Sequence, residues 1–355
     1  MTENEVRTEI TEETAAQPKK KMSKGTKTLL IIACVIVGIA LLLVGTVLIL
    51  SNIGERALTD DGSNIDVSDN ADVLDNGTIR YKGKLYRYND KVTTILLMGI
   101  DDKEKSEFEG KYGNANQSDV NVVAVLDPVN ERMTLFAISR DAMCEIEVLD
   151  DAGNFVGPAR AQLAIAHSYG DGGELSCELT THAVSGILHG ISVPAYGSIY
   201  IDGIVDLVDL VGGVEVTSKM TYGPFVEGQN VLLQGNLTET YIRHRADTTE
   251  GNNERMQREN QVLLALVHTA LSKAKHDPMS IPATYAGVKE NVTTNITTSM
   301  MVYLAKSAIT MDFDGTIHTV PGESVLGEHR YAEFNIDEEA LFDMIIDIFY
   351  IPVEE

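Results

Sequence analysis

Aspartate and arginine side chains stand where predicted strands begin and end. The strand predicted over Thr93–Asp101 ends in an aspartate, the strand over Val120–Pro128 follows Asp119, and the strand over Arg132–Asp141 closes with Arg140. Carboxylate oxygens are the ligands that Mg²⁺ and Mn²⁺ prefer. An arginine beside such a cation suits a phosphate or a pyrophosphate. The pattern therefore predicts a site for metal-assisted phosphate chemistry.

The order of the strands decides whether these side chains meet. Asp127-Pro128-Val129-Asn130 is a turn sequence, so the strands on either side of it should pair antiparallel. The start of one then lies beside the end of the other, which brings Asp119 close to Arg140. Asp101 joins them if the first strand runs alongside the third. The alternative is that charges at strand ends are simply solvated.

Four clustered arginines form a second candidate site: Arg243, Arg245, Arg255 and Arg258. The last two are three residues apart in the first turn of a predicted helix, so they should share one face. Guanidinium groups at a helix N-terminus suit a multiply charged anion. The alternative is a set of surface salt bridges with Asp247, Glu250, Glu254 and Glu259.

The elements that must position these residues alternate between strands and helices. This pattern predicts an α/β fold in which a mixed sheet is sandwiched between helices. A hairpin is expected over Thr78–Asn89, and further strands over Gly197–Gly203, Gly213–Ser218 and Thr316–Val320. Helices are expected at the following segments: Leu163–Tyr169, Leu175–Leu188, Ile204–Leu210, Glu254–Lys275, Thr298–Ile309 and Asp337–Phe349.

The N-terminal region predicts a membrane anchor. Leu29–Leu50 is an uncharged apolar run long enough for a helix to cross a bilayer, and it follows five clustered lysines, Lys19, Lys20, Lys21, Lys24 and Lys27. The positive-inside rule then places the N-terminus in the cytoplasm and everything after residue 50 outside. A cleaved signal peptide is the alternative, but its apolar core would be shorter.

The domain organisation follows from this anchor. Residues 1–28 are expected to form a cytoplasmic tail, 29–50 a transmembrane helix and 51–76 a flexible, polar stalk. Residues 77–355 then form the extracellular catalytic domain, with a core at 92–275 and a C-terminal extension at 276–355.

Composition excludes several classes of protein. The chain has 355 residues, of which 44% are hydrophobic and 23% charged, so it folds. Its net charge of -25 repels nucleic acid, and all of this negative charge follows residue 50, because residues 1–50 carry a net charge of +1. Cys144 and Cys177 fall in the part expected outside the cell. They are either a disulfide or two buried thiols.

The motifs and their order resemble the LytR–CpsA–Psr family of bacterial cell-envelope proteins. The resemblance covers residues 92–275, behind an anchor of the right orientation. It rests on the following segments: Gly99-Ile100-Asp101, Ser118-Asp119, Arg140-Asp141, His167–Gly173, Val208–Val214, Leu233–Gly235, Tyr241–Arg245 and Gly251–Gln261.

The resemblance implies a phosphotransferase on the outer face of a Gram-positive membrane. Such an enzyme joins a glycopolymer carried on undecaprenyl pyrophosphate, for example a teichoic acid or a capsule chain, to peptidoglycan. The implied fold is an α/β sandwich with a hydrophobic tunnel for the polyprenyl tail, and the implied cofactor is Mg²⁺ or Mn²⁺. A helix-turn-helix does not fit in the short cytoplasmic tail, so direct transcriptional control is disfavoured. The sequence is silent on oligomeric state.

The family's roles carry over to numbered positions. Asp101 and Asp119 match the metal-binding aspartates, and Arg140 matches the arginine that contacts the pyrophosphate. Asp141 or Asp119 is the candidate general base. The matches to the pyrophosphate-binding arginines are Arg243, Arg245, Arg255 and Arg258.

Six positions depart from the family pattern, and two of them are Ser139, which replaces a proline, and Asn260, which replaces a glutamine. Gln117 replaces an arginine, Asn252 replaces an aspartate, Glu259 replaces a glutamine and Gln162 replaces a lysine. Glu259 should either repel a pyrophosphate or pair with an arginine and weaken its hold. These departures keep two alternatives open. One is a non-catalytic, polyprenyl-pyrophosphate-binding or envelope-regulatory protein, and the other is a polyprenyl pyrophosphatase.

Overall fold

The computed structural model describes residues 45–60, 62–74, 77–100, 110–244, 251–277, 284, 286–328 and 331–353. Asp101 and Arg245, two of the predicted site residues, lie outside these ranges. Leu50–Glu355 forms one compact unit. The fold of this unit is the mixed α/β fold that the sequence predicts.

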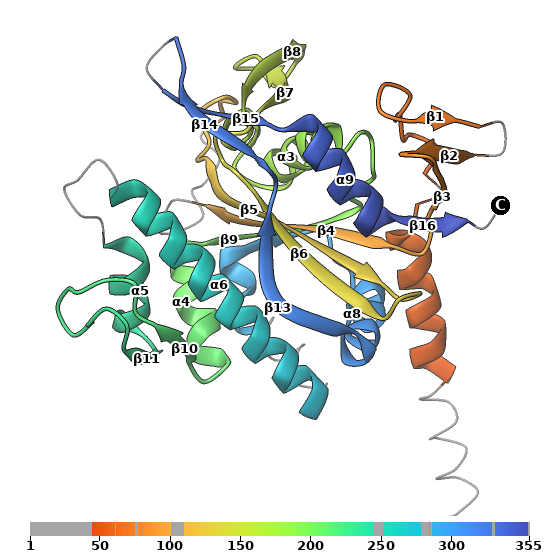
Figure 1. The fold of residues 1–355 in the computed structure, drawn as a ribbon. Coiled ribbons are helices and arrows are strands. Elements are labelled where there is room, and N and C mark those ends of the chain that lie inside the picture. The colour runs from red at the N-terminus through yellow and green to blue at the C-terminus, as the bar shows by residue number, and fades with distance from the viewer. Residues whose placement is uncertain are drawn as a thin grey trace, which may run out of the picture. The chain divides into compact units, whose positions relative to one another are not determined.

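A six-stranded mixed sheet lies at the centre of the unit (Figure 1). Its two middle strands are antiparallel neighbours, and parallel pairing occurs only further out, between β4 and β9 and between β6 and β13. In spatial order the strands are β12 (Val292–Thr294), β9 (Ala195–Tyr200), β4 (Thr93–Ile100), β5 (Ser118–Asp127), β6 (Arg132–Ile138) and β13 (Asp312–Thr319).

Helices cover both faces of this sheet (Figure 1). On one face, the sheet packs against α2 (Leu163–Ser168), α3 (Glu174–Ile187) and α9 (Glu338–Phe349), and Phe342 and Phe349 of α9 are fully buried there. On the other face, it packs against α6 (Gly251–His276) and α8 (Thr298–Thr310). Strands β4 and β5 read as nearly continuous apolar runs because both of their faces are covered.

A smaller apolar cluster lies beside α6. It joins that helix to α4 (Ile201–Leu210), α5 (Asn236–Arg243) and the hairpin of β10 (Val214–Thr217) with β11 (Asn230–Leu233). Tyr241 is buried in this cluster, where its hydroxyl donates to Gln261 Oε1 at 2.7 Å. This contact fixes α5 against the first half of α6.

Three further sheets surround the centre. The hairpin predicted over Thr78–Asn89 is present, and the last strand of the chain pairs with it. The other two sheets, which the sequence analysis did not identify, are the hairpins β7–β8 and β14–β15. The remaining bounds are β1 (Asp72–Val73), β2 (Thr78–Tyr81), β3 (Lys84–Tyr88), β16 (Tyr350–Val353), β7 (Met143–Leu149), β8 (Phe155–Gln162), β14 (Gly322–Leu326), β15 (Ala332–Ile336) and the 3₁₀ turn Lys289–Asn291.

The condition under which Asp101 would join Asp119 and Arg140 is not met. The first predicted strand, β4, does not run alongside the third, β6, because β5 lies between them. The end of β4 instead meets the start of β5, where Ile100 pairs with Ser118. Asp101 follows Ile100 directly but lies outside the described residues, so its position at the site stays a prediction.

The segment after the predicted anchor also differs from expectation. In place of a flexible stalk over 51–76, the structure has a helix that ends at residue 58, and the short strand β1. Leu58 and Val67 are buried against the sheet and α3, which gives these residues a structural role. Among the described residues, no helix has the length and apolarity needed to cross a bilayer. Residues 29–44, most of the predicted span, are outside that set.

Candidate active site

The start of β5 places Asp119 at the centre of the site. Gly99 pairs with Val120 and Ile100 pairs with Ser118, so Asp119 is one extra residue on β5, a β-bulge. A bulge turns a side chain out of the regular alternation of a strand. On the other side of β5, Asn121 pairs with Ile138, and the same register continued by two residues sets Asp119 opposite Arg140. The predicted approach of Asp119 to Arg140 is therefore confirmed.

Two guanidinium groups converge on the Asp119 carboxylate. Arg140 donates from Nη1 to Oδ1, and Arg255 of α6 donates from Nη2 to Oδ2 at 3.0 Å. The carboxylate is only 4% exposed, and the two arginine side chains are 19% and 14% exposed. Low exposure strengthens these charge-assisted hydrogen bonds, because little water screens them. Residues from both candidate clusters thus form one site.

Arg140 also holds two neighbours. Its Nη2 donates to Gln117 Oε1, and its Nε lies 3.6 Å from Asp141 Oδ1. Gln117, which stands where the family has an arginine, therefore positions Arg140 through its amide oxygen. Burial raises the pKa of Asp141 above the usual aspartate value, although the Arg140 charge opposes this shift.

Gln162 supports Asp141 from the end of β8. Its Nε2 donates to Asp141 Oδ1 at 3.0 Å and to the Ala332 carbonyl at 2.6 Å. It therefore links the base candidate to β15 in the C-terminal extension. From the sequence, Gln162 was identified only as a residue that departs from the family lysine. Its contact with Ala332 could not be predicted, because the two residues lie far apart in the chain.

Glu259 pairs with an arginine, one of the two outcomes expected for it. Its Oε1 lies 3.6 Å from Arg255 Nε, one helical turn away on α6. Arg255 is thus flanked by two carboxylates, those of Asp119 and Glu259. Part of its positive charge is already balanced before any anion binds.

Arg258 does not share a face with Arg255 toward the site, which corrects the expectation from their spacing. Its side chain is 1% exposed, with Nε donating to the Tyr241 carbonyl at 2.8 Å and Nη2 donating to the His244 carbonyl. These carbonyls stand at the C-terminal end of α5, where carbonyl groups have no partner within the helix. Burial lowers the pKa of the Arg258 guanidinium below its ordinary value. In this structure Arg258 joins α5 to α6.

The other predicted arginine contacts are only partly described. Arg243 closes α5, and its Nε lies 3.5 Å from Glu239 Oε1 on the same helix. Arg245 lies outside the described residues. Asn252 falls in the first turn of α6, but its side chain is outside the described part. Pyrophosphate contacts by these three residues stay predictions.

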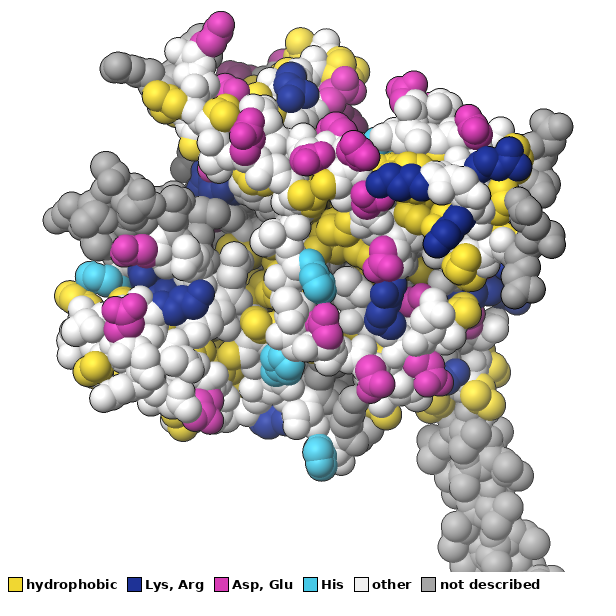
Figure 2. Space-filling model, in the orientation of Figure 1, with side chains coloured by type: hydrophobic (Ala, Val, Ile, Leu, Met, Phe, Trp, Pro, Cys, Tyr) yellow, Lys and Arg dark blue, Asp and Glu magenta, His cyan; other side chains and the backbone are white. Residues whose placement is uncertain are grey.

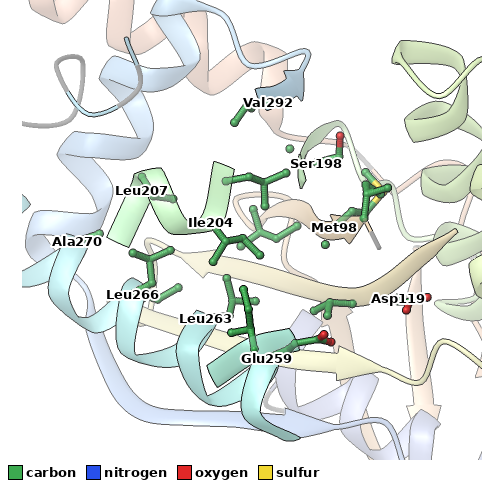
Figure 3. Close-up of a pocket in the computed structure, with 18 residues that line it drawn as sticks. Met98, Asp119, Ser198, Ile204, Leu207, Glu259, Leu263, Leu266, Ala270 and Val292 are labelled. Atoms are coloured by element: carbon green, nitrogen blue, oxygen red, sulfur yellow. The ribbon is translucent and has the colours of Figure 1, made fainter. Parts of the chain in front are cut away.

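An apolar cavity of about 270 Å³ opens beside Asp119 (Figure 3). Asp119 and Glu259 are its carboxylate-bearing lining residues, and its walls are aliphatic side chains from the sheet, α4 and α6. Figure 3 shows Asp119 at one end and Ala270 at the other. The labelled aliphatic residues are Met98, Ile204, Leu207, Leu263, Leu266, Ala270 and Val292. Such a cavity suits an extended hydrocarbon chain whose charged end lies at Asp119.

The donor chemistry at Asp119 is compatible with a divalent cation. A carboxylate oxygen is the ligand type that Mg²⁺ and Mn²⁺ prefer. Within the part of the chain that the structure describes, no group of three His, Cys, Asp or Glu side chains could hold a metal ion. Asp119 is therefore the described member of the predicted pair, and Asp101 is the undescribed one.

Cys144 and Cys177 are buried free thiols in this structure. Cys177 Sγ donates to Ser198 Oγ at 3.4 Å. Burial raises the pKa of the Cys144 thiol to about 12, which keeps it protonated and unreactive. Of the two alternatives, the structure has the buried thiols.

Known proteins support the same fold. Teichoic acid transferases named TagU from Bacillus mycoides and Enterococcus faecalis are 29% and 28% identical over 60% and 54% of this chain. The chain spans 64% and 58% of the length of these curated relatives. The crystal structure of Bacillus subtilis TagV matches with a TM-score of 0.56 and 24% identity, covering 72% of this chain and 95% of that one, and shows the fold alone.

The family assignment rests on the greater part of the chain. Residues 59–345 match the LytR_cpsA_psr family. The match begins next to the helix that ends at residue 58 and includes the sheet, the arginine-bound Asp119 and the apolar cavity. The chain belongs to the LytR–CpsA–Psr family.

Proposed function

We propose that this protein is a phosphotransferase that joins a glycopolymer, carried on undecaprenyl pyrophosphate, to peptidoglycan. The observation that carries the proposal is the meeting of Arg140 and Arg255 at Asp119, at the end of an apolar cavity. The printed name of the TagU relatives, polyisoprenyl-teichoic acid–peptidoglycan teichoic acid transferase, supports the same substrate classes. A teichoic acid is the favoured glycopolymer, and a capsule chain is the other.

The apolar cavity and the arginines bind different parts of the donor. The polyprenyl tail lies along the aliphatic walls, so its pyrophosphate comes to the Asp119 end. Arg140 and Arg255 then turn from the carboxylate toward the phosphate oxygens. They stabilise the negative charge that grows on the leaving polyprenyl phosphate.

Asp141 is the proposed general base. A sugar hydroxyl of peptidoglycan attacks the phosphorus that carries the glycopolymer, and the bond from this phosphorus to the bridging oxygen breaks. The hydroxyl proton passes to Asp141, whose raised pKa makes it a stronger base than an exposed aspartate. The products are a phosphodiester-linked glycopolymer and polyprenyl phosphate.

Mg²⁺ or Mn²⁺ is the proposed cofactor. Asp119 and Asp101 would hold the cation, which supplies further positive charge against the pyrophosphate. The oxygen chemistry of the Asp119 carboxylate supports this part of the proposal.

The proposed location is the outer face of the cell membrane, with one span over residues 29–50 and the N-terminus in the cytoplasm. The clustered lysines before the span support this orientation. Alkaline phosphatase fused after Glu355 should be active in whole cells, because this enzyme needs an oxidising exterior to form its disulfides. An inactive phosphatase fusion together with a fluorescent cytoplasmic reporter would contradict this orientation.

A second candidate function is binding without turnover. The pairing of Glu259 with Arg255 favours it, since an arginine that is already balanced holds a pyrophosphate less firmly. Such a protein would retain the polyprenyl-linked ligand and report on it or store it.

One experiment tests both candidates. The full-length protein in detergent is incubated with a prenyl pyrophosphate, with Mg²⁺ or with EDTA, and phosphate release is followed. The Arg140→Ala variant runs alongside. We expect release that requires both Mg²⁺ and Arg140.

Other outcomes decide against parts of the proposal. Ligand binding without release would support the receptor, and release that EDTA leaves unchanged would exclude the metal. Release to water that an added peptidoglycan fragment never redirects would indicate a pyrophosphatase. Absence of both binding and release would show that the site is not a pyrophosphate site.

A further inference from the structure

A second cavity, of about 330 Å³, adjoins the site on another side of Asp119. It shares Asp119 and Val120 with the apolar cavity, so the start of β5 borders both. Its other walls come from the end of β6, from α6 and from the segment that joins β13 to β14. The residues that matter here are Asn121, Ser139, Asn260, Thr319 and Phe334.

The chemistry of this polar cavity differs from that of the apolar one. Two amide side chains, Asn121 and Asn260, and two hydroxyl side chains, Ser139 and Thr319, line it. Among the described residues Asp119 is its one ionisable lining residue, and Phe334 adds an aromatic wall. Amides and hydroxyls pair with a neutral, hydroxyl-bearing ligand, whereas a polyanion would lack cations here. A sugar ring fits this lining, with hydroxyls at the amides and its apolar face on Phe334.

Asn121 carries an unused acceptor at this cavity. Its side chain is 1% exposed, and its Nδ2 donates to the Ser118 carbonyl at 2.9 Å. Its Oδ1 is buried and has no hydrogen-bond partner among the described residues. Buried polar atoms are nearly always paired in folded proteins, so an unpaired one at a cavity wall indicates a missing donor. A ligand hydroxyl would supply that donor once the Asn121 side chain turns its Oδ1 toward the cavity.

The polar cavity and the apolar cavity share Asp119 and Val120, so an acceptor in one would lie beside a donor in the other. The attacking and leaving oxygens lie roughly in line on opposite sides of the transferred phosphorus. With the leaving polyprenyl phosphate at the apolar cavity, the attacking hydroxyl must approach from another side of Asp119. We infer that the polar cavity binds the acceptor, through a neutral hydroxylated sugar of the peptidoglycan glycan strand. This inference rests on the proposed phosphotransferase function.

Steady-state kinetics on single substitutions test the inference. Asn260→Leu removes an amide, and Thr319→Val removes a hydroxyl at nearly constant volume. Asn260→Gln keeps the amide. Gln257→Leu is the matched control, because Gln257 is exposed on the same helix and lines neither cavity. The full-length protein is assayed with a prenyl-pyrophosphate-linked disaccharide as donor and chitotetraose as acceptor probe.

The inference predicts a separation of the two substrates. Asn260→Leu and Thr319→Val should each raise the acceptor KM about 10-fold, the value of one lost hydrogen bond. The donor KM and the release of prenyl phosphate to water should stay within about twofold, since water needs no sugar pocket. Asn260→Gln should recover most of the acceptor affinity, and Gln257→Leu should behave as the parent protein.

Two kinetic results would overturn the inference. A rise in the donor KM with an unchanged acceptor KM would assign the cavity to the donor's first sugar. Unchanged constants for both substrates would mean that the cavity binds neither sugar.

Equilibrium binding of chitotetraose separates this inference from the proposed function. If the parent protein binds the oligosaccharide but transfers nothing, and Asn260→Leu abolishes binding, the sugar cavity stands and the transferase proposal fails. If transfer occurs but chitotetraose binding is insensitive to Asn260→Leu and Thr319→Val, the transferase stands and the polar cavity is not its acceptor site.

Discussion

At the scale of single residues, the site depends on one buried carboxylate shared by two arginines. A lone buried charge is costly, but Asp119 meets Arg140 and Arg255 within hydrogen-bonding distance. The two guanidinium groups outweigh the Asp119 charge by one, but the Asp141 and Glu259 carboxylates that pair with them offset this excess.

Replacing the acid at position 259 should strengthen donor binding. In Glu259→Gln, Arg255 loses one of its two carboxylate partners and offers more charge to the pyrophosphate. We expect the KM for a prenyl pyrophosphate to fall about fivefold, since pairs of this kind contribute about 1 kcal/mol. Substrate titrations of both proteins measure the change. A weaker donor affinity would mean that Glu259 orients Arg255 instead of competing for it.

The proposed base predicts a definite pH dependence. Burial raises the pKa of Asp141, and only the ionised carboxylate accepts a proton. The rate should therefore fall as the pH drops through this raised pKa, at a pH above the usual aspartate range. A pH profile of kcat/KM locates this acid limb, and Asp141→Asn should lower the rate about 100-fold and remove the limb. A limb that persists in Asp141→Asn would assign it to another group.

At the scale of elements, neighbouring residues in the second and third turns of α6 have different roles. Arg255 contacts Asp119, and Arg258 donates to a backbone carbonyl of α5. Glu259 lines the apolar cavity, and Asn260 lines the polar cavity. Helical geometry separates these directions, since residues one or two apart do not face each other. The helix thus joins the site to its structural support.

Arg258 should matter more for folding than for chemistry. Arg258→Met leaves the Tyr241 and His244 carbonyls without their donor in a buried place, at a cost of about 3 kcal/mol in the free energy of unfolding. Arg255→Ala, at the more exposed position, should reduce prenyl phosphate release by at least about 10-fold and change stability much less. Urea unfolding and initial rates measure the two effects. The reverse order of effects would place Arg258 in the anion site.

At the scale of the whole described unit, helices on both faces exclude water from the sheet. The site lies where the central strand β5 begins. The polar cavity is bordered by β14–β15 residues of the C-terminal extension, and Gln162 ties Asp141 to the same hairpin. Acidic and basic side chains are interspersed on the face that Figure 2 shows.

The apolar cavity should measure the length of the lipid. Ala270 lies at the end opposite Asp119, so a bulky side chain there blocks long chains only. Ala270→Trp should raise the KM for a long polyprenyl pyrophosphate at least about 10-fold and leave a short prenyl pyrophosphate nearly unchanged. Ser272→Trp, exposed on the same helix and outside the cavity lining, is the control. Equal losses for both chain lengths would place the tail elsewhere.

The sequence predicted a large part of the fold because its strands and helices are strongly periodic. The expected positions of β4, β5 and β6 agree with the structure to within a few residues. The turn at Asp127–Asn130 correctly predicted that β5 and β6 pair antiparallel. The hairpins β7–β8 and β14–β15 were missed, and in each of them one strand, β8 or β14, is largely exposed and lacks an apolar repeat. Residues 51–58 were predicted to be part of a flexible stalk because their composition is polar. They form a helix instead, and Leu58 of this helix is buried.

By itself, the sequence determined the α/β class, the family resemblance and the juxtaposition of Asp119 with Arg140, since each follows from local pattern and strand pairing. Only the tertiary structure decided which arginine of α6 reaches Asp119, because a spacing of three residues does not say where a neighbouring helix lies. It also decided that two cavities of opposite polarity meet at Asp119. Cavities form between elements far apart in the chain, and no local pattern of residues specifies them.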